Sequence, residues 1–291
     1  MLVILGPTAS GKTTLAVQMA RQLNGEILSA DSRQVYRGMD IGTGKDLAEY
    51  SVGGPAVPYH LIDIVDAGDD YNVFRYQRDF DAALADVLSR GKTPIVCGGS
   101  GLYIEAALRP ETMLPIPPND DLRAELAQLT DAQLLDLFRA NPSPYTPLAD
   151  TSTRKRLIRA IEIGTYLNAA GSPVSGPGNV PALRRDLPPY RVIGLNPPVP
   201  LRRERISRRL RDRLQHGLID EVRQLLDAGI PPEKLIFYGL EYKFVTEYVL
   251  GTLPYDAMVG QLETAIHQFA KRQMTFFRKL ERDGLLIEWR G

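Results

Sequence analysis

Residues 6–13 read GPTASGKT and fit the phosphate-binding pattern G-x-x-x-x-G-K-[ST] at every fixed position. Glycines let the backbone bend so that successive N–H groups point at one anion, and the helix that follows adds partial positive charge. Lys12 brings a full charge to the outer phosphate, and Thr13 is placed to hold a magnesium ion. The pattern predicts a di- or triphosphate site, with a chance glycine-rich turn as the alternative, and it does not say which bond breaks. The residues of the predicted site are Gly6, Pro7, Thr8, Ala9, Ser10, Gly11, Lys12 and Thr13.

The segments on either side of this loop support that interpretation. Residues 2–5 are a short apolar run, as expected of a buried parallel strand. Residues 14–23 carry apolar side chains at helical spacing, and Asn24 and Gly25 are a typical helix end. The loop therefore lies between a strand and a helix, which is the context that phosphate binding requires.

A second predicted strand, residues 26–31, ends in Asp31. In open parallel sheets the ligand crevice lies outside the carboxyl ends of the strands, so this carboxylate is expected to face the bound ligand. It could hold magnesium or act as a general base, and the spacing alone does not choose between these roles. A cap on a turn or helix is the structural alternative. Residues 32–45, rich in glycine and polar groups, are expected to form a shaped loop.

Strands and helices alternate along the first part of the chain, which predicts an α/β fold. We expect a parallel sheet with helices on both faces, like that of the P-loop NTPases. The pattern breaks at a run of prolines after Arg109 and returns near residue 190. The predicted organisation is therefore a catalytic core made of residues 1–112 and 191–291, with a small helical insertion at residues 113–190.

The expected elements beyond the phosphate loop are short strands and amphipathic helices. The predicted strands are residues 59–65, 93–97, 190–196 and 285–289. A second glycine-rich turn, residues 98–101, opens a helix that runs to residue 108. The other predicted helices are residues 76–89, 120–130, 131–139, 153–167, 200–216, 218–226, 244–250 and 255–280.

Charge is balanced over the whole chain but not along it. Lysine and arginine number 35, as do aspartate and glutamate, so the net charge makes no global case for nucleic acid. Residues 184–223, however, carry eleven arginines against five acids, and one or two of these arginines could clamp a pyrophosphate. Contact with an RNA backbone and a solvated face are the alternatives, and Asp212 is the expected partner of Arg208 or Arg209. Four arginines share one helical stripe, namely Arg202, Arg205, Arg209 and Arg213.

Basic and aromatic side chains interleave in residues 267–278, which read HQFAKRQMTFFR. This composition suits RNA, because aromatic faces stack on bases and cations meet phosphates. Aromatic residues at helical spacing also pack into protein cores, and the sequence does not decide between the two.

The single cysteine, Cys97, excludes an internal disulfide and a Cys-based zinc site, and we expect it to be a small buried residue. Residue 1 leads directly into the first predicted strand, so no signal peptide is expected. No apolar run approaches the length that crosses a membrane. We expect a cytoplasmic monomer without a membrane partner.

Six strings taken together resemble one family, the tRNA dimethylallyltransferases, which prenylate an adenine beside the anticodon. The strings lie in order and cover nearly the whole chain. Many families share the phosphate loop, whereas the string around Asp31, joined to the KRQ segment, is far more specific. The strings are GPTASGKT (6–13), SADSRQVYRGMDIGT (29–43), GGSGLY (98–103), RLIRAIE (156–162), GLIDEV (217–222) and QFAKRQMTFFR (268–278).

The resemblance implies a fold similar to small P-loop kinases, with a helical insertion that grips the anticodon stem-loop of tRNA. It implies that the loop holds the pyrophosphate of dimethylallyl diphosphate with Mg²⁺, and that ATP is not cleaved. Asp31 would take a proton from the exocyclic amine of adenine as that amine attacks the prenyl carbon. Lys12, Thr13 and Arg209 would stabilise the departing pyrophosphate. Ser100 stands where the family usually has threonine, near the reacting amine.

The resemblance also implies how tRNA is held, with the target base flipped out to reach the prenyl donor. Arg156 falls on a family arginine of the active-site region. Two stretches depart from the family: Ser152, Thr153 and Lys155 replace Asn-Asp and often Gln, and residues 238–243 read YGLEYK instead of Ile-Gly-Tyr-Lys/Arg-Gln. These departures bear on tRNA contact and leave the diphosphate site untouched. The residues expected to touch tRNA are Asp31, Ser32, Arg33, Gln34, Ser100, Arg123, Lys155, Arg156, Lys271 and Arg272.

Two other functions remain open at the level of sequence. A P-loop kinase of a small metabolite would close an arginine-rich lid over ATP and would have no need of the basic segment around Lys271. A non-catalytic RNA-binding P-loop module would keep its biological activity when Asp31 is replaced by alanine.

Overall fold

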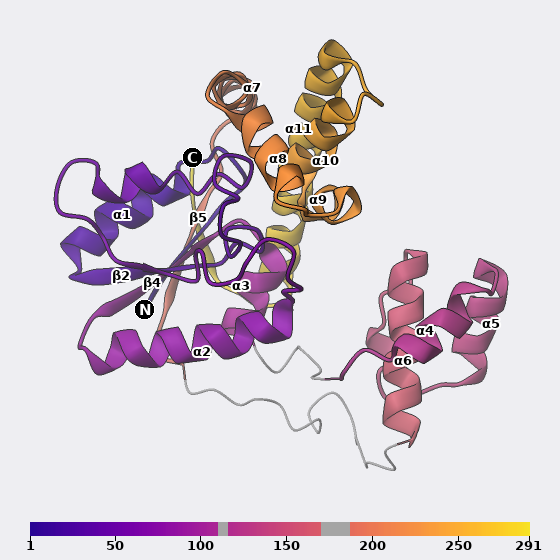
Figure 1. Ribbon diagram of the computed structural model, residues 1–291. Coiled ribbons are helices and arrows are strands. Elements are labelled where there is room, and N and C mark those ends of the chain that lie inside the picture. The colour runs from indigo at the N-terminus through magenta and orange to yellow at the C-terminus, as the bar shows by residue number, and fades with distance from the viewer. Residues whose placement is uncertain (110–115, 170–186) are drawn as a thin grey trace. The chain divides into compact units, whose positions relative to one another are not determined.

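The computed structural model describes residues 1–109, 116–169 and 187–291, and it divides into two compact units (Figure 1). The first unit combines Met1–Leu108 with Asp186–Gly291, and the second is Arg109–Arg185. We refer to them as the core and the insertion. Each is described by itself.

A six-stranded sheet forms the centre of the core, and all its strand pairs are parallel. The strand order is β3-β2-β4-β1-β5-β6, so the first strand of the chain is central and pairs with β4 on one side and β5 on the other. β1 is a continuous apolar run, and both β1 and β2 are fully buried, as expected of a sheet covered on both faces. The strands are β1 (Leu2–Leu5), β2 (Gly25–Ser29), β3 (Tyr59–His60), β4 (Thr93–Gly98), β5 (Arg191–Leu195) and β6 (Ile287–Arg290).

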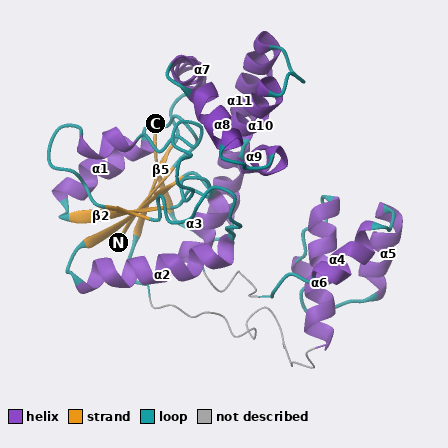
Figure 2. Cartoon of the chain, in the orientation of Figure 1, coloured by secondary structure: helices purple, strands orange, loops and turns teal. Residues whose placement is uncertain are grey.

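Helices cover both faces of this sheet (Figure 2). The helix α1 (Lys12–Gln22) packs Ala16, Val17 and Ala20 against alternate side chains of the strands. On the other side lies α2 (Val73–Ser89), which begins where the Asn72 side chain accepts hydrogen bonds from two backbone amides. The short helix α3 (Gly101–Leu108) follows β4, and a 3₁₀ helix, η1 (Leu47–Ser51), packs against α1. The predicted α/β fold is confirmed.

A layer of five helices lies beyond β5 in the chain and shares one apolar cluster with the loop that follows β2. Val35, Tyr36 and Met39 of that loop are buried against these helices. The loop is therefore shaped by residues almost 200 positions later in the chain. The helices are α7 (Val199–Gln215), α8 (Leu218–Asp227), α9 (Pro232–Tyr238), α10 (Leu240–Val249) and α11 (Tyr255–Arg282).

The insertion has an apolar cluster of its own, built on Leu126, Leu134, Leu157 and Ile161. A capping box between Thr130 and Gln133 starts its middle helix. Its elements are α4 (Asp120–Ala127), α5 (Asp131–Ala140), a 3₁₀ turn, η3 (Thr146–Leu148), and α6 (Arg154–Ala169).

Two predicted elements were wrong in extent. The strand expected at residues 59–65 ends at His60, because Leu61 and Asp63 adopt positive φ angles of 65° and 55°, which no strand accommodates. The helix expected at residues 244–250 begins at Leu240, and α9 was not predicted at all. Both helices flank Gly239, whose φ of 148° separates them.

Cys97 is buried with a free thiol, as expected, and burial raises its pKa to about 12. Within the described part of the chain, no helix combines the length and the apolar character needed to cross a membrane.

Candidate active site

The phosphate loop joins β1 to α1, and its backbone takes the conformation that the pattern predicts. Ala9 and Gly11 have φ angles of 60° and 87°, in the left-handed region that lets consecutive amides turn inward. Gly6 cannot carry a side chain, because a Cβ atom there would lie 2.7 Å from Ser10 Oγ and 3.0 Å from Leu195 O. The Ser10 hydroxyl is buried and finds no hydrogen-bond partner among the described residues. The loop thus has the shape and the spare polar groups of an anion cradle.

Two cations converge on this loop. Lys12 Nζ donates a 3.3 Å hydrogen bond to Pro7 O, and the Arg209 guanidinium on α7 donates one to Thr8 Oγ1. Burial lowers the pKa of Lys12, while the nearby carboxylates of Asp31 and Glu49 raise it. Burial also lowers the pKa of Arg209 to about 10, so the group is still cationic at neutral pH. A bound anion would relieve this crowding of positive charge.

A second arginine on α7, Arg213, adds to the positive charge near Arg209. Arg213 lies one helical turn further along α7. Burial is the largest cause of the lowered pKa of Arg209, the charge of Arg213 is the next, and Glu241 acts in the opposite direction by raising that pKa. Arg213 itself is buried and holds Asp46 at 3.2 Å between Nη2 and Oδ2. Arg213 is thus paired with Asp46, whereas Arg209 binds the phosphate loop through Thr8.

Gln273 ties the phosphate loop to the glycine-rich turn after β4. Its Oε1 accepts a 2.8 Å hydrogen bond from Thr8 N, and its Nε2 donates a 2.8 Å bond to Gly99 O. A Cβ atom at Gly99 would lie 2.6 Å from Gln273 Nε2, so a side chain there would displace the Gln273 amide from this bridge. Sequence reasoning placed Gln273 inside a conspicuous string but gave it no role, because its partners are more than 170 residues away.

Asp31 and Ser100 lie at the carboxyl ends of β2 and β4, which are neighbours in the sheet. Asp31 Oδ1 accepts a 2.9 Å hydrogen bond from Arg33 N, which closes a tight turn. Ser100 Oγ accepts a 3.1 Å bond from Ser32 N and lies 3.3 Å from Ser32 Oγ. Gly98 allows this close packing, because a side chain there would overlap Ala30 O. A carboxylate and a hydroxyl are thus held beside the phosphate loop.

The residues that could hold a metal are few. Thr13 is half-buried, and no hydrogen bond of its hydroxyl is found in the described ranges, whereas Thr14 Oγ1 donates to Glu49 Oε2 at 3.0 Å. Within those ranges no three His, Cys, Asp or Glu residues cluster as a metal site would require. The described residues at the loop therefore offer a few hydroxyl and carboxylate oxygens, and most ligands would have to come from a bound phosphate and water.

Glu221 on α8 holds the loop that follows the Asp31 turn. Its carboxylate accepts hydrogen bonds from three successive backbone amides, those of Asp40 (2.8 Å), Ile41 (2.7 Å) and Gly42 (3.0 Å). It also accepts a 2.7 Å bond from Tyr242 OH. The sequence showed Glu221 only as part of the string GLIDEV, and no local signal revealed what it binds.

Comparison of the sequence with protein-family models identifies the family of this chain. A model described as IPP transferase matches residues 34–280, and one described as isopentenyl transferase matches residues 1–53. The chain belongs to the IPP transferase family.

Relatives agree with this assignment. The tRNA dimethylallyltransferase 1 of Parabacteroides distasonis is 52% identical over 289 residues, which cover 99% of this chain and 91% of the relative. A protein of the same name from Porphyromonas gingivalis is 53% identical over 293 residues, covering 99% and 93%. Among solved structures, the tRNA isopentenylpyrophosphate transferase of Bacillus halodurans matches with a TM-score of 0.69 and 33% identity, covering 99% of this chain and 88% of that one.

A second structure supports the fold alone. A eukaryotic dimethylallyltransferase acting on tRNA matches with a TM-score of 0.75 and 21% identity, covering 99% of this chain and 73% of that one. The two halves of this IPP transferase's core are therefore arranged as in proteins with very different sequences.

The remaining site residues predicted for this IPP transferase fall into two groups. Gln34 points inward, where it accepts from Ser29 Oγ at 2.9 Å and donates to Gly44 O at 3.0 Å. Lys271 and Arg272 are exposed on α11, and the Arg272 guanidinium lies 5.9 Å from the Phe269 ring centroid. The aromatic segment serves the core as well, because Phe277 is fully buried.

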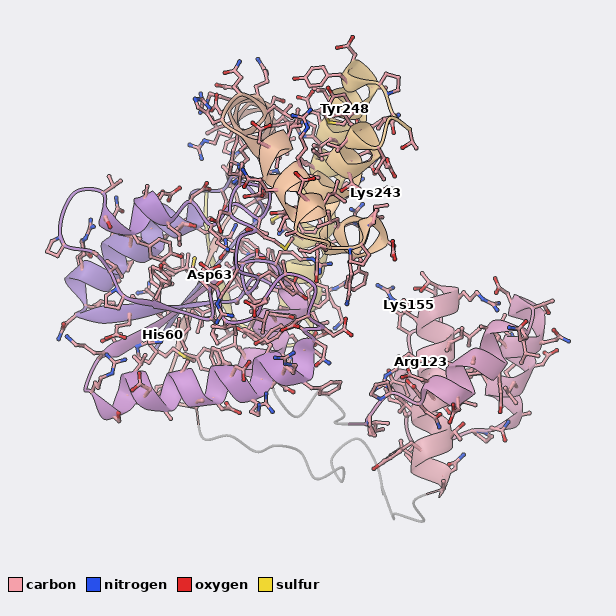
Figure 3. The ribbon with its side chains drawn as sticks, in the orientation of Figure 1. His60, Asp63, Arg123, Lys155, Lys243 and Tyr248 are labelled. Atoms are coloured by element: carbon pink, nitrogen blue, oxygen red, sulfur yellow. The ribbon has the colours of Figure 1, made fainter. Side chains whose placement is uncertain are left out.

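The other predicted tRNA-binding residues of this IPP transferase belong to the insertion. Figure 3 shows Arg123 on α4 and Lys155 on α6. Arg123 Nε lies 3.0 Å from Oε1 of the buried Glu162, so part of its charge is used within the insertion. Arg156 pairs with Asp150 Oδ2 at 2.8 Å.

One predicted ion pair on α7 was wrong. Asp212 was expected to bind Arg208 or Arg209, but Arg208 lies 3.3 Å from Glu204 and Arg209 turns to the phosphate loop. Helical spacing places an acid within reach both four residues before and four residues after Arg208, and here Arg208 pairs with the acid before it, Glu204. At the edge of the sheet, His60 Nε2 lies 2.7 Å from Glu26 Oε2 (Figure 3).

Proposed function

We propose that this protein transfers the dimethylallyl group of dimethylallyl diphosphate to the exocyclic amine of an adenosine beside the anticodon of tRNA, releasing diphosphate. The observation that carries the proposal is the convergence of Lys12 and Arg209 on one loop, next to the carboxylate of Asp31. An anion cradle beside a base is what a displacement with a diphosphate leaving group needs. The family and the names of the relatives agree with it.

The diphosphate half of the site would act on the leaving group. Negative charge grows on the bridging oxygen as the carbon–oxygen bond breaks, and Lys12 and Arg209, which both contact the phosphate loop, would stabilise that charge together with the loop amides. Gln273 would keep the loop in register with the turn that carries Ser100. Cations that the fold already holds at the loop would reduce the reorganisation needed as charge develops.

Asp31 would act on the nucleophile. Its carboxylate takes a proton from the exocyclic amine while the amine nitrogen forms a bond to the prenyl carbon, and the electron pair of the broken carbon–oxygen bond leaves with diphosphate. The turn that fixes Asp31 Oδ1 to Arg33 N leaves Oδ2 to face the amine. The Ser100 hydroxyl, held against Ser32, would position the same amine.

Magnesium fits this site as a companion of the diphosphate. The hydroxyl of Thr13 and the buried, unpaired Ser10 Oγ are hard oxygen donors at the loop, and a protein cage is lacking in the described ranges. Mg²⁺ usually binds in this way, through few protein ligands, substrate phosphates and water. When bound, it would neutralise charge on the diphosphate, with Thr13 as its protein ligand.

The tRNA would be gripped by both units of a monomer in the cytoplasm. Ser32, Arg33 and Gln34 follow the proposed base directly, and Lys271 and Arg272 present positive charge on α11. Arg123, Lys155 and Arg156 would add contacts from the insertion. The reacting adenosine must leave the base stack to reach Asp31.

The test incubates the protein with radiolabelled dimethylallyl diphosphate, Mg²⁺ and several unmodified tRNAs. We expect label in tRNAs that carry adenosine beside the anticodon, and none when that adenosine is replaced by guanosine. A parallel reaction with labelled ATP and no prenyl donor should leave tRNA and small metabolites unlabelled. Phosphoryl transfer from ATP, with no prenylated tRNA, would overturn the proposal in favour of a kinase.

A further inference from the structure

An aromatic side chain at the end of α9 is displayed on the surface by a rigid support. Phe237 is 55% exposed, whereas its neighbour Tyr238 is 1% exposed. Tyr238 is fixed from two sides, because its hydroxyl accepts from Gly68 N at 2.7 Å and donates to Asp69 O at 3.2 Å. The Tyr238 ring also packs on Tyr36, with centroids 4.4 Å apart. Phe237 therefore sits at a helix end that cannot easily move.

Arg33 connects this aromatic residue to the proposed base. Its Nη2 donates a 2.8 Å hydrogen bond to Phe237 O, and its guanidinium lies 5.1 Å from the Phe237 ring centroid and 5.9 Å from that of Tyr238. The backbone amide of the same residue binds Asp31 Oδ1. Two residues of chain span at most about 7 Å, so the Arg33 backbone cannot be farther than that from Asp31.

A planar cation beside an exposed ring is a surface for stacking. Arginine planes and aromatic faces both stack on nucleobases, and single-stranded RNA is held largely in this way. A guanidinium has five N–H donors, and in the described ranges Phe237 O is the one acceptor that Arg33 binds. The other donors can therefore meet base edges or phosphates.

The reaction creates a need for such a surface. When the reacting adenosine flips out of the stack, the base that preceded or followed it loses its stacking partner, at a cost that the enzyme must offset. We infer that Arg33 and Phe237 form a stacking platform for the nucleobase next to the reacting adenosine, and that this platform sets the preferred sequence context. The inference rests on the proposed function and adds to it a residue, Phe237, that directly precedes the stretch departing from the family pattern.

The test combines protein variants with anticodon stem-loop RNAs in the presence of dimethylallyl diphosphate and Mg²⁺. One RNA is intact, one has an abasic site 5′ of the reacting adenosine, and one has it 3′. On intact RNA, Phe237→Ala should lower kcat/KM about 5- to 150-fold, mainly through KM, as expected for the loss of one base stack. On one of the two abasic RNAs the variant and the wild type should be equal within about twofold.

Three further measurements separate stacking from a structural role. Phe237→Tyr, which keeps the ring, should restore near wild-type kcat/KM, and Phe237→Leu, which keeps only apolar bulk, should not. Tyr255→Ala removes another exposed ring, 44% accessible and packed on Tyr248, and should leave kcat/KM unchanged on every RNA. Melting temperature and diphosphate binding by calorimetry should be the same in Phe237→Ala and the wild type.

The outcomes are distinct. An equal loss for Phe237→Ala on all three RNAs, or no loss on any, would overturn the stacking platform while leaving prenyl transfer by the wild type intact. If the wild type transfers no prenyl group to any RNA, the proposed function itself fails. A loss on intact RNA that vanishes on one abasic RNA supports the inference and identifies the side on which the base lies.

Discussion

Replacing Glu221 should release the loop after Asp31 while leaving the phosphate loop in place. The Glu221 carboxylate receives four hydrogen bonds, and those from Gly42 N and Tyr242 OH are fully buried. A buried donor left without its partner costs about 1–3 kcal/mol. Glu221→Ala leaves two such donors, so the free energy of unfolding should fall by about 2–6 kcal/mol. For a unit of this size that lowers the melting temperature by roughly 5–20 °C.

The assay pairs thermal and urea unfolding with amide hydrogen exchange. The amides of Asp40, Ile41 and Gly42 should exchange faster in Glu221→Ala, while those of β1 keep their rank order of protection. Tyr242→Phe removes one donor and leaves the three amide contacts, so it should cost less than Glu221→Ala. Because the two residues share a hydrogen bond, their effects should not add in the double variant.

A clear result would refute this reasoning. If Glu221→Ala costs less than about 1 kcal/mol and the three amides stay protected, then the loop is held from its other side. Lys45 is the group that would do so, since its buried ammonium binds Tyr36 O at 2.7 Å, Asp40 Oδ1 at 2.6 Å and Asp63 Oδ1.

Three other predictions follow from the site and its surroundings. Asp31→Asn keeps the side-chain oxygen that Arg33 N binds but removes the base. The rate of prenyl transfer should therefore fall about 10²–10⁴-fold, while tRNA affinity should change by less than a few-fold. Transfer at a near wild-type rate would show that another group takes the proton. Gln273→Ala breaks the bridge between the two loops and should weaken diphosphate binding measured by calorimetry by about tenfold. Gln273→Glu keeps the acceptor for Thr8 N but sets a carboxylate against Gly99 O and near the bound diphosphate, so it should lose more; unchanged binding in both variants would contradict the bridge. The pKa of Glu26 is lowered to about 2 by the Arg90 guanidinium and then by His60, although burial acts in the opposite direction. The carboxylate therefore stabilises the fold above pH 4.5, and this contribution is lost as pH falls toward 2. In urea unfolding, the stability of Glu26→Gln should depend less on pH across that interval than the stability of the wild type, and an equal pH dependence would contradict the lowered pKa.

The sequence predicted the parts of the site that follow from short spacing and from sheet geometry. The eight residues of the phosphate loop define their own conformation, and Asp31 follows a strand that a parallel sheet must orient toward the same edge. Ser100 follows the neighbouring strand, so its position beside the Asp31 turn is a consequence of strand order. These features depend on local pattern and one topological rule.

The parts that could not be predicted depend on distant partners. Gln273 meets Thr8 across 265 positions of sequence, and Glu221 meets Gly42 across 179. A glutamine on a buried helix face or a glutamate in an amphipathic helix carries no mark of such a partner. The early end of β3 could not be predicted either, because the positive φ of Leu61 has no local sequence signal.

The central position of β1 fixes the order in which the core can be completed during synthesis. Leu2–Leu5 is made before both of its neighbours, and one of them, β5, starts only at Arg191. Until then one edge of the strand has no partner from its own sheet, so the nascent chain carries an open edge while the insertion is being made. The intervening length costs little at closure, since doubling a loop adds only about 0.6 kcal/mol. An insertion at this point therefore delays the core without destabilising it, which makes the connection between β4 and β5 a permissive place for acquiring a separate helical unit.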